Sequence, residues 1–182
     1  MTEDALGRGR MFAMIQPDAS RAALPSGPAL FRVGCLGRLS SFSETEDGRY
    51  LITLFGLIRF TWAEELPMRR GYRQVRGDFS DYLADLGPPP DPPNIGVPRE
   101  DVLGALRSYF AHTGFDANWD AIGKMADDTL VTTLSMVCPF QPAEKQALLE
   151  APTDADRGTI LLTLLKMGAA GGDPTGSGRA VS

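Results

Sequence analysis

The side chains best suited to nucleophilic chemistry are two cysteines and one histidine. Cys35 and Cys138 lie far apart in the sequence, and His112 is the sole histidine. A nucleophilic thiol needs a base within hydrogen-bonding reach, and the residues beside either cysteine supply none. His112 follows an amphipathic segment, which favours a histidine near the negative end of a helix over a general base. We therefore predict no catalytic residues.

Metal, phosphate and acid–base sites are not indicated either. One histidine and two dispersed thiols cannot complete a zinc site. Gly34 and Gly37 lie in an apolar run without the strand–loop–helix context of a phosphate-binding loop, which favours a tight backbone crossing instead. Asp78, Asp81 and Asp85 are typical of a solvated face and do not single out an acid–base pair. We expect neither metal nor cofactor.

Composition limits the class of protein. Of 182 residues, 43% are hydrophobic and 23% charged, which is typical of a globular chain. The net charge of −5 argues against nucleic acid as a partner, because phosphate binding needs clustered Lys and Arg. No apolar run is long enough to span a bilayer, and the acidic start lacks the apolar core of a signal peptide. We expect a cytoplasmic protein with unpaired, buried cysteines and no membrane partner.

The elements are organised around one long β-hairpin over residues 31–62. Asp47-Gly48 separates two apolar arms, residues 31–39 and 50–62, and glycine accepts the positive φ of a tight turn. In the second arm the apolar side chains of one parity should share a face; these are Ile52, Leu54, Ile58, Phe60 and Trp62. Gly56 interrupts that face and predicts a bulge or a close backbone approach.

Shorter elements flank the hairpin. Residues 11–16 form an apolar run ended by Pro17, which predicts a buried strand. Residues 63–71 are charged and predicted irregular, residues 72–79 favour an edge strand, and residues 80–86 a short helix.

A proline run then separates strand-rich from helix-rich sequence. Proline fixes φ and lacks an amide donor, so the run is neither helix interior nor paired strand. Strand residues before it and helix residues after it predict an α+β chain. We assign residues 1–86 to a β-rich part, 87–97 to a connector, 98–168 to a helical subdomain and 169–182 to a disordered tail.

The helical half carries several start signals. The predicted helix starts are Pro98, Asn118, Asp127 or Asp128, Pro142 and a capping box at Thr153 with Asp156. Val102, Leu106, Tyr109 and Phe110 lie at helical spacing and predict a core-facing stripe.

What remains is a surface that could bind polypeptide. Apolar side chains near the hairpin ends, with arginines beside them, would suit an extended or unfolded chain. The candidate polypeptide-binding residues are Phe42, Leu57, Arg59, Met68 and Tyr72. The alternative is that these residues only seal a second layer of sheet.

The order of several motifs resembles a known family. A strand ending in Gln16-Pro17 is followed by residues 31–39, Asp47-Gly48 and residues 56–60. Later, residues 138–142 (Cys-Pro-Phe-Gln-Pro) precede the last helix. From about residue 5 to residue 168, this combination resembles the substrate-binding N-terminal domain of Lon-type ATP-dependent proteases. It resembles more closely the stand-alone bacterial proteins that consist of this domain alone.

The resemblance implies a β-rich PUA-like pseudo-barrel followed by a helical subdomain. It implies a non-catalytic module in protein quality control, with unfolded or degron-bearing polypeptides and a Lon-type protease as partners. No phosphate loop or Ser-Lys peptidase domain is present in the sequence, so we expect no enzyme activity. The alternatives are a PUA-like RNA-binding module and a small-molecule enzyme of unrecognised type, whose pocket would hold perturbed titratable groups. The oligomeric state is left open.

One departure from the family pattern leads to a structural expectation. Family members usually begin with a further strand-rich segment before the position of Met1. We expect a barrel without its first one or two strands, from either a late start or a shortened variant. An unpaired sheet edge should then lie near residues 11–16 or along the hairpin.

Overall fold

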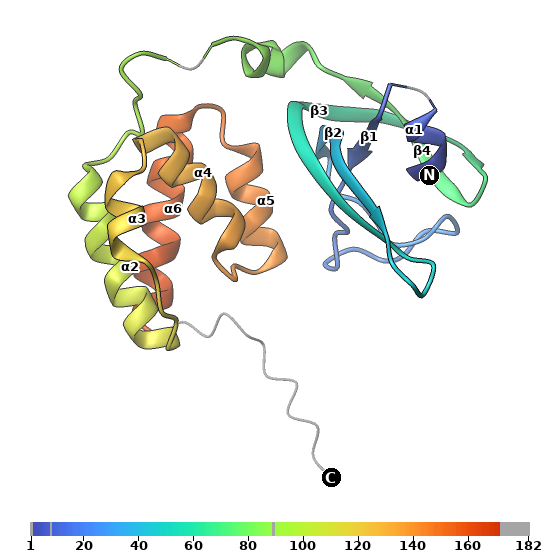
Figure 1. Cartoon of the computed structure of the whole chain (residues 1–182). Coiled ribbons are helices and arrows are strands. Elements are labelled where there is room, and N and C mark those ends of the chain that lie inside the picture. The colour runs from blue at the N-terminus through green and yellow to red at the C-terminus, as the bar shows by residue number, and fades with distance from the viewer. Residues whose placement is uncertain (1, 8, 89, 172–182) are drawn as a thin grey trace. The chain divides into compact units, whose positions relative to one another are not determined.

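The structure, a computed structural model, describes residues 2–7, 9–88 and 90–171. The chain divides into two compact units, Met1–Pro88 and Pro89–Ser182, which are described separately (Figure 1). Strands lie in the first unit and α-helices dominate the second, so the predicted α+β class is confirmed. Most of the predicted tail, residues 172–182, lies outside the described residues.

The first unit is an antiparallel sheet with strand order β1-β2-β3-β4. Its elements are α1 (Thr2–Leu6), β1 (Met11–Met14), β2 (Val33–Glu44), β3 (Tyr50–Arg69), β4 (Tyr72–Asp78) and the 3-10 helix η1 (Ser80–Leu86). Among the described residues β1 and β4 are its edge strands, so the expected unpaired edge is present. In one small cluster of the sheet unit, Ala5, Phe12 and Leu39 are buried, with Leu6, Ile52 and Leu54 packed against them. Val33, Ile58 and Phe60 are also buried in this unit.

The predicted hairpin is confirmed as β2 and β3. At its turn the amide of Thr45 donates to the carbonyl of Arg49 at 2.8 Å, and Gly48 has φ of 75°. A side chain at Gly48 would be strained in this left-handed conformation. The pairing shifts register beside Gly56, where Gly37 pairs with Gly56 and Leu36 with Ile58, so the predicted bulge lies there.

The prediction of irregular structure for residues 63–71 is wrong. β3 continues through this charged segment to Arg69 and pairs with β4. Glu65 accepts two hydrogen bonds of 2.7 Å from Arg73, and Glu64 lies 2.7 Å from Arg76. Charged side chains thus form cross-strand pairs on the sheet surface instead of breaking the strand.

Residues 11–16 were predicted as a buried strand, and only part of this is correct. β1 is a strand, but Phe12 is its buried side chain, whereas Met11 and Met14 are exposed. Alternation accounts for Met11, which projects from the face opposite to Phe12. Met14 has the parity of Phe12 but is the last residue of β1, where its side chain stays exposed. The tight crossing predicted for the glycines holds at Gly34, where an added Cβ would lie 2.8 Å from the Met14 carbonyl.

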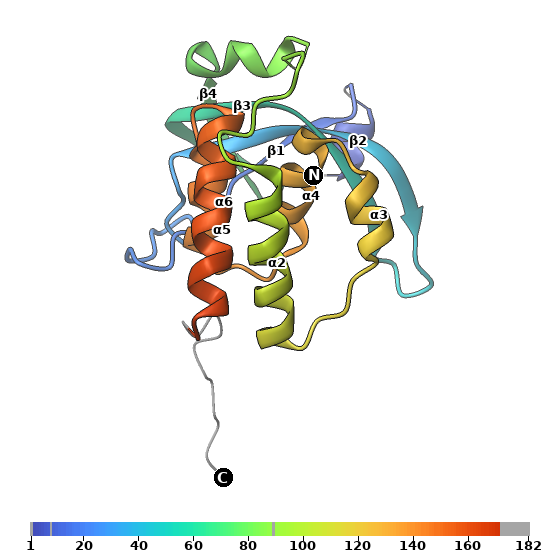
Figure 2. The ribbon, with the colours of Figure 1, turned by 90° about the vertical axis from the view of Figure 1, so that its left-hand side faces the viewer.

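The second unit consists of α2 (Arg99–Thr113), α3 (Trp119–Lys124), α4 (Asp127–Val137), α5 (Pro142–Glu150) and α6 (Asp154–Ala169). Figures 1 and 2 both place α2 and α6 side by side, in agreement with their extensive contacts. Of the predicted stripe, Val102, Leu106 and Tyr109 are buried, and Phe110 is half-buried against the same core. Asn118 and the Thr153–Asp156 capping box also act as predicted. The predicted cap at Asp127 or Asp128 is wrong, because Ala126 precedes the first helical residue.

Candidate functional site

The far end of the β2–β3 hairpin carries large apolar side chains that solvent reaches. We define the hairpin surface as Phe42, Tyr50, Leu51 and Phe55, with exposed fractions of 41%, 38%, 70% and 67%. Contiguous exposed apolar groups commonly mark interaction sites in proteins.

Strand alternation divides this surface between two faces. The rings of Phe42 and Tyr50 lie 5.0 Å apart, which places them on one face. Leu51 and Phe55 differ in parity from Tyr50 and project from the other face. The hairpin therefore exposes apolar side chains on both faces, whereas a strand over a core usually buries one.

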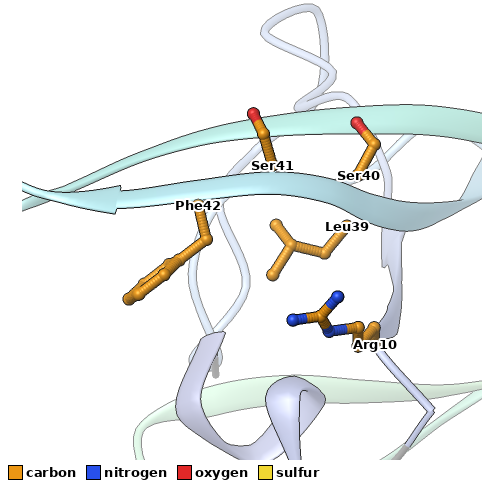
Figure 3. A pocket seen from close by; sticks show the side chains of 5 residues that line it. All are labelled: Arg10, Leu39, Ser40, Ser41 and Phe42. Atoms are coloured by element: carbon orange, nitrogen blue, oxygen red, sulfur yellow. The ribbon is translucent and has the colours of Figure 1, made fainter.

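A pocket of about 110 Å³ lies where β1 meets β2, lined by Arg10, Leu39, Ser40, Ser41 and Phe42. Figure 3 shows Leu39, Phe42 and Arg10 on one side of β2, with the two serine hydroxyls on the other. Those hydroxyls bond to Thr53, Ser40 at 3.1 Å and Ser41 at 2.8 Å. The pocket thus places the Phe42 ring and the buried Leu39 side chain beside a guanidinium and two serines.

The backbone holds Arg10 in an unusual conformation beside this pocket. Its φ is 60°, a left-handed value that L-residues with side chains adopt at some cost. Its amide donates to the Ala5 carbonyl at 2.8 Å, and its carbonyl accepts from the Leu39 amide at 2.7 Å. The turn between α1 and β1 therefore fixes where this side chain starts.

The candidate residues from the sequence lie at separate places along the 20-residue strand β3 and its partners. Phe42 belongs to the hairpin surface, and Leu57 is half-buried beside the bulge. Met68 is exposed near the β3–β4 turn, where Tyr72 begins β4. At about 3.3 Å per residue, the two ends of β3 are far apart along the strand. Their role in binding polypeptide stays a prediction.

Arg59 and Tyr72 have partners within the sheet unit. Arg59 is 8% exposed, and its guanidinium donates to both carboxylate oxygens of Asp85 at 2.9 and 2.7 Å. The Tyr72 hydroxyl donates to Asp4 at 3.0 Å, and this hydrogen bond is the main cause that lowers the pKa of the Asp4 carboxyl.

Sequence reasoning missed Arg10, Tyr50, Leu51 and Phe55. The parity of β3 offered a signal for the two most exposed residues, because Leu51 and Phe55 lie on the face opposite the predicted core-facing set. Arg10 had no such signal, since its proximity to Phe42 depends on pairing between segments distant in sequence.

The residues first considered for nucleophilic chemistry are not brought together. Cys35 and Cys138 are free thiols, and His112 is exposed in the last turn of α2. Cys138 is 1% exposed, and burial raises the pKa of its thiol to about 11. Within the described ranges, no three His, Cys, Asp or Glu side chains gather as metal ligands would. No helix found there is long and apolar enough to cross a membrane.

The high pKa of Cys138 predicts slow thiol labelling. At pH 8 only about one thiol in a thousand is ionised when its pKa is about 11. We expect a disulfide reagent to modify Cys138 far more slowly in the folded protein than in urea. Labelling of a Cys35→Ser variant measures this thiol alone; equal rates in both states would contradict the burial.

The fold and the surface define a class: a small α+β chain that presents an exposed apolar hairpin. The family model described as the ATP-dependent protease La (LON) substrate-binding domain matches residues 1–167. The chain belongs to this family, as its motifs indicated. A comparison with curated proteins gave no match.

Solved structures give a related result. The N-terminal domain of the Mycobacterium avium complex Lon protease is similar with 14% identity and a TM-score of 0.50, covering 90% of this chain and 91% of that chain. A Lon N-terminal domain protein from Xanthomonas campestris has 16% identity and a TM-score of 0.44, with 85% and 89% covered. At 14% identity, the first likeness shows a shared fold.

Proposed function

We propose that this chain is a non-catalytic module that binds unfolded or degron-bearing polypeptides in cytoplasmic protein quality control. A Lon-type protease is the partner to which it would deliver them. The observation that carries the proposal is the hairpin surface, which exposes apolar side chains on both faces of a ribbon. The family's description as a substrate-binding domain supports the same assignment.

The chemistry of the surface suits unfolded chains. A folded protein buries its large apolar side chains, whereas an unfolded one exposes them to any apolar partner. Exposed aromatic and aliphatic groups gain free energy by leaving water, and this gain needs no particular sequence. Binding without ATP follows, because association by apolar burial needs no nucleotide.

The RNA-binding alternative has less support. Three sheet arginines, Arg59, Arg73 and Arg76, form ion pairs with carboxylates. Phosphate contacts would compete with these pairs, and the net charge of −5 opposes the approach of a polyanion.

The test is binding of a reduced and carboxymethylated, permanently unfolded albumin, measured by fluorescence anisotropy without ATP. In the double variant Leu51→Ser and Phe55→Ser, we expect affinity to fall by about tenfold or more. Urea unfolding followed by fluorescence in a Trp119→Phe background, which leaves Trp62 of β3, would show that the sheet unit still folds.

A matched control removes equally exposed apolar groups elsewhere in the same unit. Leu83 and Leu86 in η1 are 62% and 65% exposed, and their replacement by serine should leave affinity unchanged. Equal losses in both double variants would mean that binding does not depend on the hairpin surface. No binding by the unaltered protein would refute the proposed function.

A further inference from the structure

Strand β2 extends beyond the strand that covers its outer side. β1 pairs with β2 from Cys35 to Arg38, and the Leu39 amide then donates to the Arg10 carbonyl. From Ser41 to Glu44, β2 pairs with β3, and no other described strand lies beside it. On the side where β1 pairs with the earlier part of β2, this stretch is therefore a free edge.

The backbone groups on this edge can be assigned from the turn. The Thr45 amide donates across the hairpin to Arg49. Because successive residues of an antiparallel strand turn their backbone groups to alternate sides, Phe42 and Glu44 direct theirs outward. The register shift between Leu39 and Ser41 agrees with this assignment. Ser40 is the extra residue there, so the backbone groups of both Leu39 and Phe42 point outward, away from β3.

Side-chain recognition is available at the same edge. The pocket of about 110 Å³ opens between Leu39 and Phe42, with Arg10 at its rim. None of the ion pairs found among the described side chains involves Arg10, whereas Arg59, Arg73 and Arg76 each pair with a carboxylate. A strained φ of 60° at Arg10 is the kind of backbone cost that often accompanies a functional site.

We propose that the outer edge of β2 at Ser41–Glu44 accepts an extended polypeptide strand with an apolar side chain and a carboxylate two residues apart. The apolar side chain enters the pocket, and the carboxylate pairs with Arg10. Residues two apart on a strand share a face, as Arg10 and Phe42 share one side of β2. This inference rests on the proposed function and names the class of segment that it binds.

The charges of Arg10 and Glu44 determine how the incoming segment is oriented along the edge. Glu44 lies at the far end of the free edge and would repel a carboxylate, whereas Arg10 attracts one at the near end. Strand addition supplies affinity through backbone hydrogen bonds, and the pocket supplies selectivity.

A second copy of this chain is a less suitable occupant. A stable dimer buries about 800 Å² on each partner. Pairing through four edge residues buries a much smaller area. Such a small interface suits the transient capture of a flexible segment.

The experiment uses the capped, fluorescein-labelled peptide Ser-Thr-Phe-Thr-Asp-Thr-Ser, the same residues in reverse order, and matched peptides with Asn for Asp. Of the two Asp peptides, one in each sequence order, we consider the one that binds more tightly. Anisotropy with the full chain should show that it binds about threefold to fivefold more tightly than its Asn counterpart. This preference should decrease with added salt. Equal affinity for the Asp and Asn peptides would overturn the inference.

The variant Arg10→Gly isolates the charge. Glycine adopts a φ of 60° without strain, so folding stability should be unchanged or higher while the preference for Asp is lost. Arg70→Gly is the matched control, because Arg70 also has positive φ but lies in the β3–β4 turn and pairs with Asp4. A preference for Asp that survives in Arg10→Gly would overturn the assignment of Arg10.

Strand addition has its own test. Glu44→Pro removes an outward amide and should weaken peptide binding about tenfold, whereas Glu44→Ala keeps the amide and should not. Because proline could also disturb the hairpin, a peptide N-methylated at alternate residues provides the second measurement, and it should not bind. Unchanged binding of that peptide would overturn strand addition, while albumin binding through Leu51 and Phe55 would still support the proposed function.

Self-association is the remaining outcome. Sedimentation of the protein at the concentrations used for binding should give a monomer. A dimer that Glu44→Pro dissociates and that the peptide does not displace would overturn the inference in favour of a second copy.

Discussion

Replacing Gly158 by alanine should lower the free energy of unfolding of the helical unit by about 2–4 kcal/mol. Gly158 lies in α6, and an added Cβ would be 2.0 Å from the carbonyl oxygen of Ile95. That neighbour is backbone, so it cannot rotate away as a flexible side chain would. The contact is relieved only if residues 94–97 move away from α6.

The contact between residues 94–97 and α6 is also close at a second glycine. Gly96 has φ of 71°, and a Cβ added there would lie 2.4 Å from the Ala155 carbonyl oxygen. Ile95 between the two contacts is 4% exposed within the helical core. Moving this segment would therefore expose a core side chain as well as break backbone packing.

Urea unfolding followed by fluorescence in a Trp62→Phe background measures the effect, because the remaining tryptophan, Trp119, lies in the helical unit. Gly104→Ala is the matched control. Gly104 is exposed in α2 with nothing within 4 Å of an added Cβ, and alanine there should stabilise by about 0.5–1 kcal/mol. If Gly158→Ala were as stable as Gly104→Ala, the close approach of residues 94–97 to α6 would be wrong.

Features with a local cause were predictable from the sequence. The turn at Gly48 requires a residue that tolerates positive φ, and Asp47-Gly48 announces it. The capping box at Thr153 needs only a partner three residues later, and Pro142 starts α5 for a similarly local reason. These signals involve neighbours in the chain, so no knowledge of the fold is needed.

Features that depend on distant pairing were not predictable. Glu64 and Glu65 suggest a loop by composition, and their place in β3 becomes reasonable only beside Arg76 and Arg73 of β4. The pocket at Arg10 likewise exists because β1 begins at Met11, opposite Arg38, whereas β2 continues to Glu44. Propensity cannot reveal such register.

The ion pair of Arg59 was also not predictable, because its partner is distant in the sequence. Its position in an apolar strand suggested a charge at the rim of an exposed patch, whereas its partner Asp85 lies 26 residues later. Breaking this pair is expected to cause the second large loss of stability.

The variant Asp85→Ala should destabilise the sheet unit by about 3–5 kcal/mol. The side chains of Arg59 and Asp85 are 10% and 20% exposed, and the carboxylate also accepts from the Arg59 backbone amide at 3.0 Å. The Tyr82 ring, 4.6 Å from the guanidinium, keeps water from replacing the lost partner on that side. Alanine therefore leaves a largely buried cation without its carboxylate.

Urea unfolding followed by fluorescence in a Trp119→Phe background tests this, because the remaining tryptophan, Trp62, lies in β3. Glu64→Ala breaks a solvent-exposed pair with Arg76 and should cost less than about 1 kcal/mol. Equal effects of the two variants would contradict the buried character of the Arg59–Asp85 pair.

A double replacement separates two origins of the loss. If the cost comes from an unpaired buried charge, then Arg59→Met combined with Asp85→Leu should recover much of the stability, because both charges are gone. If it comes from the lost attraction itself, the double variant should remain as unstable as Asp85→Ala. We expect recovery, since desolvation of a buried ion pair offsets much of its mutual attraction. The pair would then act mainly to specify how η1 docks on β3, and the hydrophobic contacts around it would supply the stability.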